Sequence, residues 1–268
     1  MGEVLDLAFR IFKVTLIRAL PYGIVAVIAQ QISSLYNFGR VAPGHAAPAY
    51  TLLANPAVGV ACFVLGMLLA LLAWSSMLLC QQSIVERRPT TARVELGAAL
   101  RRMMSFVPAT LLFLAVVAGD FTLLWALPPA YHSQARVPLL VVSLSLAIFL
   151  SCTWPAVLFG GLGPVAALRQ SVRLVWGNWW RLLLIYSVTA IVVLVVAVLL
   201  GALIAAVVSS LGAGVPVMTS VVYAEVANAL GAVMAPFAGA LLLAVYGDLR
   251  VRKEGTDLQQ RIVGAVVE

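Results

Sequence analysis

Six long apolar stretches follow one another along this chain, and they limit what it can fold into. Each is long enough to cross about 30 Å of hydrocarbon as a helix, which takes about 20 residues. All six are continuously apolar, whereas the strands of a membrane barrel alternate and run for about ten residues. The sequence therefore predicts an all-α integral membrane protein with six transmembrane helices, over residues 14–36, 56–82, 106–127, 137–160, 182–211 and 223–247.

The composition agrees with a chain that is embedded in lipid. Hydrophobic residues make up 63% of the chain and charged residues 10%, whereas a soluble domain carries about 25% charged residues. A water-soluble fold of 268 residues could not shelter that much apolar surface. The connections are too short for a further domain, so we predict a single transmembrane domain over residues 1–268 with a cytoplasmic tail at 248–268.

Positive charge is distributed unevenly between the two sets of connections. Arg40 and Arg136 fall on one side of the predicted membrane. The other side carries the rest of the 17 Lys and Arg residues, which are Arg10, Lys13, Arg18, Arg87, Arg88, Arg93, Arg101, Arg102, Arg169, Arg173, Arg181, Arg250, Arg252, Lys253 and Arg261. Short loops rich in Lys and Arg stay in the cytoplasm. We therefore expect both termini in the cytoplasm, and we attribute the net charge of +7 to topology rather than to nucleic-acid binding.

Three segments on the basic side have the pattern of amphipathic interfacial helices, which lie in the membrane surface. They precede spans one, three and five, and Pro164 and Gly177 bound the third. In the second, Glu95, Arg101 and Arg102 oppose the apolar residues. The apolar faces are Val4, Leu5, Ala8, Phe9 and Phe12; Leu96, Leu100 and Met103; and Val165, Leu168, Val172 and Val175. Each segment could instead extend the next span, and their recurrence suggests a threefold repeat of one helix and one hairpin.

Charged residues near the basic ends of the spans are candidate contacts for anionic headgroups or for a membrane-protein partner. The tail alternates acidic and basic residues, so its charges could also pair with the other cytoplasmic helices. The candidate contact residues are Arg101, Arg102, Arg169, Arg173, Arg181, Asp248, Arg250, Arg252 and Lys253.

Polar residues inside the apolar stretches point to a second candidate site. A carboxylate in hydrocarbon costs about 3 kcal/mol at the centre, so it should face protein or water. Counted from the predicted span ends, these residues lie in the outer half of the membrane, where they could line a pocket that opens outward. Each could instead join two helices by a hydrogen bond. The candidate pocket consists of Asp120, Glu225, Gln30, Gln31 and Asn228.

The sequence carries no pattern typical of a metal centre or of a hydrolase. His45 and His132 both lie in outer connections without further ligands, and the three cysteines lack metal-binding spacing. Neither a zinc-protease motif nor a nucleophile elbow nor a phosphate-binding loop occurs. We therefore expect no catalytic residue, no metal and no cofactor.

Three short motifs carry a resemblance to a known group. The tail from Tyr246 to Leu258 reads Tyr-x-Asp-Leu-Arg-x-Arg-x-Glu-Gly-x-Asp-Leu, residues 6–9 read Asp-Leu-Ala-Phe, and residues 167–171 read Ala-Leu-Arg-Gln-Ser. These resemble a broad group of uncharacterised bacterial six-span proteins, some of them similar to the membrane domain of glycerophosphodiester phosphodiesterase. No counterpart of the phosphodiesterase catalytic domain is present, so the resemblance implies no activity. Group members often lie beside genes for MoxR-type ATPases and transglutaminase-like proteins, which implies an accessory role in envelope assembly at the inner membrane.

Together these observations favour a non-enzymatic membrane scaffold or accessory protein of the bacterial envelope. The alternative is a small transporter or lipid-handling protein that uses the pocket near Asp120 and Glu225. An intramembrane enzyme ranks last, because no serine, cysteine or carboxylate has a suitable partner in the sequence.

The charge distribution predicts where the tail lies. A reporter that is active only in the cytoplasm should be active when it is fused after Glu268, because most Lys and Arg residues would hold that side inside. A fusion inside the connection at 128–136 is the control and should be active only with an exported reporter. Export of the reporter at the tail would contradict the predicted orientation.

Overall fold

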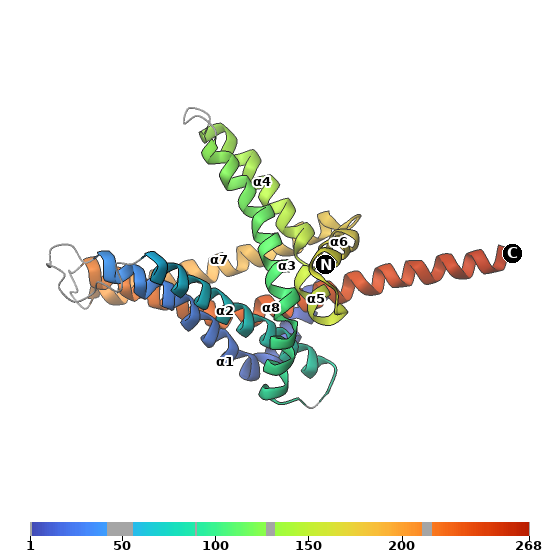
Figure 1. Cartoon of the computed structure of the whole chain (residues 1–268), viewed down its shortest axis with the longest axis horizontal. Helices are drawn as coiled ribbons and strands as arrows, with labels where there is room; N and C mark the ends of the chain where they lie inside the picture. The colour runs from blue at the N-terminus through green and yellow to red at the C-terminus, as the bar shows by residue number, and fades with distance from the viewer. Residues whose placement is uncertain (1, 42–55, 89, 127–131, 211–215, 268) are drawn as a thin grey trace. The chain divides into compact units, whose positions relative to one another are not determined.

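The structure, a computed structural model, describes residues 2–41, 56–88, 90–126, 132–210 and 216–267. Within these ranges it leaves the side chains of 33–41, 56, 116–118, 120–126, 132–136, 204–205, 208–210, 216–226, 254 and 256–267 undescribed. The described residues are almost entirely helical, and no strand occurs among them (Figure 1). The helices are α1 (Gly2–Val41), α2 (Pro56–Val85), α3 (Ala92–Ala126), α4 (His132–Leu150), α5 (Thr153–Gly160), α6 (Pro164–Val175), α7 (Trp179–Ser210) and α8 (Pro216–Val267).

Six helical segments are long and apolar enough to cross a membrane, which confirms the predicted all-α membrane fold. In the described residues they are Gly2–Ile32, Ala57–Val85, Ala92–Ala115, Val137–Gly160, Trp179–Leu203 and Ala227–Lys253. Many of their large apolar side chains are exposed, among them those of Ile17, Phe63 and Leu194. Exposed apolar surface of this extent is typical of a chain whose surroundings are lipid.

The structure corrects two of the three predicted interfacial helices. Helix α1 already begins at Gly2, and α3 begins at Ala92, so the segments before spans one and three are the first turns of those spans. The alternative of a simple helical extension applies to both. Nothing in either segment interrupts the helix: Pro21 and Pro108 lie further along, inside α1 and α3, and neither ends its helix.

The third predicted interfacial segment is a separate helix, α6. Pro164 occupies its first turn and Gly177 follows it with a φ of 90°, a backbone conformation that glycine adopts without strain. Its buried side chains are Ala167, Ser171, Leu174 and Val175. Of the predicted apolar stripe, only Val175 is therefore buried. Small residues allow α6 to pack closely, while Val165 and Val172 remain exposed on another side.

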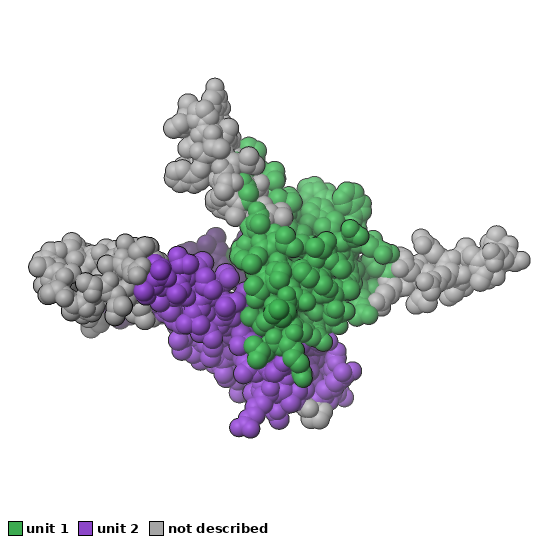
Figure 2. Space-filling model, in the orientation of Figure 1, with its two compact units in different colours: residues 1–10, 100–190, 240–268 green, residues 11–99, 191–239 purple. Residues whose placement is uncertain are grey.

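The chain groups into two compact units that are both assembled from segments distant in the sequence (Figure 2). Unit 1 comprises residues 1–10, 100–190 and 240–268, and unit 2 comprises residues 11–99 and 191–239. Helices α1, α3, α7 and α8 each contribute residues to both units. The single-domain organisation and the threefold repeat stay predictions from the sequence.

In unit 2, a proline in α8 creates the point at which α1 makes its closest approach. Pro236 has no amide hydrogen, so the carbonyl group of Ala232, one turn earlier, loses its helical partner. Gly23 of α1 lies directly against that carbonyl oxygen, and a Cβ atom at position 23 would collide with it. The glycine is therefore required by the contact, because its Cα hydrogens can approach the oxygen where a side chain could not.

Helix α2 meets α8 in the same unit through a buried glutamine. The side-chain amide of Gln81 donates a hydrogen bond of 2.7 Å to the carbonyl oxygen of Pro236. The Gln81 Oε1 atom lies so close to Gly239 that an added Cβ would approach it to 2.5 Å. Gln81 and Gly239 are both buried, so this contact has little room to relax. A third glycine, Gly66 of α2, lies in the same way against the carbonyl oxygen of Ala29 in α1.

In unit 1, the fourth span is interrupted. Helix α4 ends at Leu150 and α5 begins at Thr153, although the sequence predicted one continuous helix over 137–160. Pro155 explains the break, since it cannot donate to the carbonyl group of Ser151 and its ring clashes with that group. The carbonyl group of Phe149 at the break is satisfied from α6, where the Ser171 hydroxyl donates to it at 2.7 Å.

Short helix α5 is held by aromatic side chains of unit 1. The Trp154 indole donates a hydrogen bond of 3.1 Å to the Thr110 hydroxyl of α3 and packs 4.9 Å from the ring of Phe113. At the other end of α5, the ring of Phe159 lies 6.2 Å from that of Tyr246 in α8. These contacts fix α5 against α3 and α8, so the interrupted span remains ordered.

The glycine contacts of unit 2 can be tested by adding a single methyl group. Gly23→Ala should lower the free energy of unfolding by about 1–3 kcal/mol, because α1 must move away from the Ala232 carbonyl. The buried thiols of Cys80 and Cys152 allow a thiol-reactive dye to report thermal unfolding in mild detergent. The control is Gly231→Ala, an exposed position of α8 with open space around it, which should leave the midpoint unchanged or raise it. Equal midpoints for the two variants would contradict the close contact.

Candidate functional site

A buried carboxylate is the centre of a polar network in unit 2. Glu95 lies in the first turn of α3, and its exposed fraction is 3%. Among the described side chains, no other charged residue is buried. An acidic residue is favourable in the first turn of a helix, because the free amide groups there carry partial positive charge. The Thr91 carbonyl accepts from the Val94 and Glu95 amides, which fixes the start of the helix.

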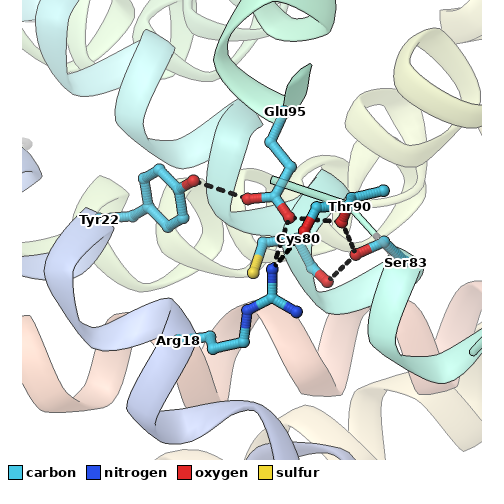
Figure 3. A network of polar contacts seen from close by, with 6 residues as sticks. All are labelled: Arg18, Tyr22, Cys80, Ser83, Thr90 and Glu95. Carbon is cyan, nitrogen blue, oxygen red and sulfur yellow. Dashed lines mark hydrogen bonds and ion pairs between the residues drawn. The ribbon is translucent and has the colours of Figure 1, made fainter. Parts of the chain in front are cut away.

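Three donors from other parts of unit 2 converge on the two oxygens of Glu95 (Figure 3). The Tyr22 hydroxyl of α1 donates to Oε2 at 2.6 Å. The Thr90 hydroxyl donates to Oε1 at 2.7 Å, and the Arg18 guanidinium forms an ion pair with the same oxygen at 3.5 Å. Both oxygens are therefore engaged, which lowers the cost of burying a charge.

The network also fixes the connection between α2 and α3. Arg18 donates to the Thr90 carbonyl group at 2.8 Å, and the Thr90 hydroxyl lies 2.8 Å from the hydroxyl of Ser83. Ser83 in turn donates to the Cys80 carbonyl group at 2.8 Å (Figure 3). One buried carboxylate therefore joins α1, the end of α2, the connection and the start of α3.

The position of Glu95 corrects the predicted amphipathic pattern of this segment. The sequence placed Glu95 on a charged face opposite Leu96 and Leu100, yet Glu95 is buried while those leucines are 46% and 62% exposed. The reason is that the partners of Glu95 come from α1 and from Thr90, and local periodicity does not record them. The sequence feature that could have indicated the burial of Glu95 is an acidic residue in the first turn of a helix, next to apolar residues.

A second polar cluster lies in unit 1, where α7 begins and span six ends. Two Arg181 guanidinium nitrogens each lie 3.4 Å from an Asp248 carboxylate oxygen. The Arg252 Nε atom lies 3.1 Å from both oxygens of the same carboxylate. Asp248 and Arg181 side chains are only 22% and 18% exposed, so solvent screens this pair incompletely. The sequence predicted that the tail charges contact lipid headgroups, contact a partner, or pair with another helix. For Asp248, the structure shows pairing with another helix.

The other predicted contact residues differ in exposure. Arg102 and Lys253 are half-buried. The exposed members of the set are Arg101, Arg169, Arg173 and Arg250. Arg169 and Arg173 lie one turn apart on α6, beside the exposed side chains of Val165 and Val172. Within the described part of the chain, these two arginines make no ion pair.

The predicted outer pocket is described only in part. Gln30 is exposed, and Gln31 and Asn228 are half-buried. The side chains of Asp120 and Glu225 lie outside the described residues. Whether these five residues meet in one pocket therefore stays a prediction. Among the described residues, no group of three or more His, Cys, Asp and Glu side chains is placed to hold a metal ion.

Comparison with known proteins adds no assignment. No family model, no curated protein and no solved structure matches the chain. The resemblance to the six-span bacterial group consequently stays a prediction.

Removing the central carboxylate should loosen the network of unit 2. Glu95→Ala leaves the Tyr22 and Thr90 hydroxyls without their acceptor, at about 1–3 kcal/mol for each unpaired group. The thermal midpoint should therefore fall, with a smaller fall for Glu95→Gln, which retains one acceptor oxygen. The control is Asp6→Asn, which removes the ion pair between Asp6 and Arg10. Their side chains are 72% and 74% exposed, so this pair should contribute little to stability. A midpoint for Glu95→Ala within error of that control would contradict a stabilising role.

Proposed function

We propose that this chain is a non-enzymatic scaffold or accessory subunit of the bacterial inner membrane, with both termini in the cytoplasm. The observation that carries the proposal is the environment of Glu95. Tyr22 and Thr90 each donate to one of its oxygens, and Arg18 adds an ion pair. A carboxylate whose two oxygens are both occupied in this way joins helices and leaves neither oxygen open to a substrate.

The second cluster supports the same proposal. Arg181 and Arg252 both engage Asp248, so the acidic group of that region is also used to hold two helices together. Polar side chains of unit 1 and unit 2 therefore stabilise helix ends within each unit. A scaffold needs this property, because it presents a fixed surface rather than a changing one.

The partner surface that we propose is the exposed side of α6. Arg169 and Arg173 carry two positive charges one turn apart, and the apolar side chains of Val165 and Val172 lie beside them. The opposite side of α6 is fixed by the hydrogen bond from Ser171 to the Phe149 carbonyl group. This combination suits an acidic segment of a membrane-protein partner at the cytoplasmic surface, where arginines contribute to recognition.

A small transporter or lipid-handling protein is the alternative, with its pocket near Asp120 and Glu225. It predicts flux across proteoliposomes that depends on a proton or a substrate gradient and is lost in Asp120→Asn. The scaffold proposal predicts instead that Asp120→Asn and Glu225→Gln leave function intact.

Copurification tests the scaffold directly. A tagged chain extracted from its native membrane in mild detergent should retain a partner at a fixed ratio, measured by quantitative mass spectrometry. Arg169→Gln with Arg173→Gln should reduce that ratio at least tenfold, because the charges that face the partner are removed. The control is Arg10→Gln, an exposed arginine whose ion pair lies within α1. Absence of a stoichiometric partner, or equal loss in the control, would overturn the proposal.

A further inference from the structure

The connection between α2 and α3 holds an arginine where the backbone favours glycine. Arg87 has a φ of 54°, and among the described residues no other non-glycine residue has a positive φ. The end of α2 requires this conformation, because the Arg87 amide donates to the Ile84 carbonyl group at 3.1 Å and the Arg88 amide to that of Ser83 at 2.9 Å. In the left-handed region a Cβ atom crowds the following carbonyl oxygen, so a side chain here is strained.

The Arg87 side chain brings no contact within the protein that would offset this strain. It is exposed, and within the described part of the chain its guanidinium makes no ion pair or side-chain hydrogen bond. The neighbouring acid, Glu86, is engaged by Arg88 at 3.1 Å and by the Gln82 amide at 2.7 Å. Strained residues of this kind are typical of positions that contact a ligand.

A second arginine of the same connection is also unfavourably placed. Arg93 lies in the first turn of α3, where the free amide groups carry partial positive charge and a basic side chain is disfavoured. It is exposed, and it too makes no ion pair with any described residue. The Glu95 carboxylate, two residues later, is already engaged by Arg18, Tyr22 and Thr90. Two positive charges therefore remain without a counter-charge.

The buried network holds both arginines at one level of the protein. The Thr90 hydroxyl lies 2.8 Å from that of Ser83 and donates to Glu95 at 2.7 Å (Figure 3). These contacts place the start of α3 beside the end of α2. The connection that carries Arg87 and Arg93 is therefore a fixed surface of unit 2, and its two charges need no further ordering before they meet a ligand.

The apolar surroundings of the connection indicate a ligand at the membrane surface. Helix α2 contains no charged residue up to its last residue, Val85, so it can remain in lipid along its whole length. Arg87 follows two residues later, at the level of the headgroups. The side chains of Val85 and Val94, which flank the connection, are 52% and 56% exposed. Apolar side chains beside arginines are typical of surfaces that contact anionic lipid.

We propose that the α2–α3 connection binds anionic phospholipid, with Arg87 and Arg93 contacting headgroup phosphates and Val85 and Val94 contacting the adjoining acyl region. The planar guanidinium group suits a phosphate, because it can donate two parallel hydrogen bonds to it. This surface goes beyond the proposed scaffold function and shares no residue with the proposed partner surface on α6. Either proposal can therefore fail without the other.

Photo-cross-linking in liposomes locates the lipid directly. The purified full chain is reconstituted with phosphatidylglycerol or phosphatidylcholine that carries the same photoreactive group next to the phosphate, and cross-links in residues 82–97 are quantified by mass spectrometry after peptic digestion. The yield should be at least fivefold higher with phosphatidylglycerol. Arg87→Gln and Arg93→Gln should each lower it about fivefold. The control is Arg10→Gln, an arginine whose ion pair lies within α1, and it should leave the yield unchanged.

Three results of that experiment would overturn the proposal. Equal yields with the two lipids would show that the surface does not select negative charge. Equal loss in Arg10→Gln would show that only the net charge of the chain matters. Competition by soluble glycerol 3-phosphate as strong as that by unlabelled phosphatidylglycerol would show that the arginines bind a free anion instead of a lipid.

Arg87→Gly separates the backbone strain from the lipid contact. Glycine adopts a φ of 54° without strain, so the thermal midpoint in neutral detergent should rise by about 2–4 °C. Cross-linking to phosphatidylglycerol should fall about fivefold in the same variant, because the guanidinium is lost. Arg87→Gln retains a Cβ atom and should lose the cross-link without the rise in midpoint. An unchanged or lowered midpoint for Arg87→Gly would overturn the proposal, since Arg87 would then occupy its position at no disadvantage.

Discussion

Polar groups surrounded by lipid have to find their partners within the protein, and much of this structure follows from that requirement. Pro236 deprives the Ala232 carbonyl of its helical partner, and Gly23 of another helix lies against the freed oxygen. Pro155 interrupts the fourth span, and Ser171 of α6 donates to a carbonyl group at the break. In each case a proline creates a local need, and a residue distant in the sequence meets it. The helices pack at these positions because the backbone requires a partner there.

The charged clusters follow the same rule near the ends of helices. Glu95 is buried, but donors from α1 and from the α2–α3 connection occupy both its oxygens. Asp248 engages one arginine of its own helix and one of α7. A buried ion pair adds little net stability by comparison with apolar packing, but losing one partner is costly. Such clusters therefore fix which helices meet within a unit more than they add to stability.

Hydropathy alone predicts the number of spans. Six apolar stretches are long enough to cross the bilayer, and the connections between them are too short or too polar to do so. It fails where a helix continues beyond the lipid: α1 and α3 begin well before the apolar residues of their spans. It also fails at Pro155, since a proline in a predicted span either bends the helix or breaks it, according to what surrounds it. Pro21, Pro108 and Pro236 are found inside continuous helices.

The candidate site shows a different limit. Glu95 was visible in the sequence as one charge among several on a helix face, but its burial depends on Tyr22 and Arg18, more than 70 residues away. Periodicity describes one helix at a time and carries no information about such partners. Exposed arginines such as Arg169 and Arg173 were easier to predict, because a charge with no partner in its own segment normally remains at the surface.

The contact among Gly23, Gln81 and Pro236 has a consequence for how the sequence can vary. Replacing the proline would return an amide hydrogen to α8, and the Ala232 oxygen beside Gly23 would then have a hydrogen-bond donor in its own helix. The glutamine donates to the carbonyl group of that same proline, and its environment would change with it. Tolerance at each of the three positions is therefore conditional on the other two, and relatives of this chain should exchange them as a set.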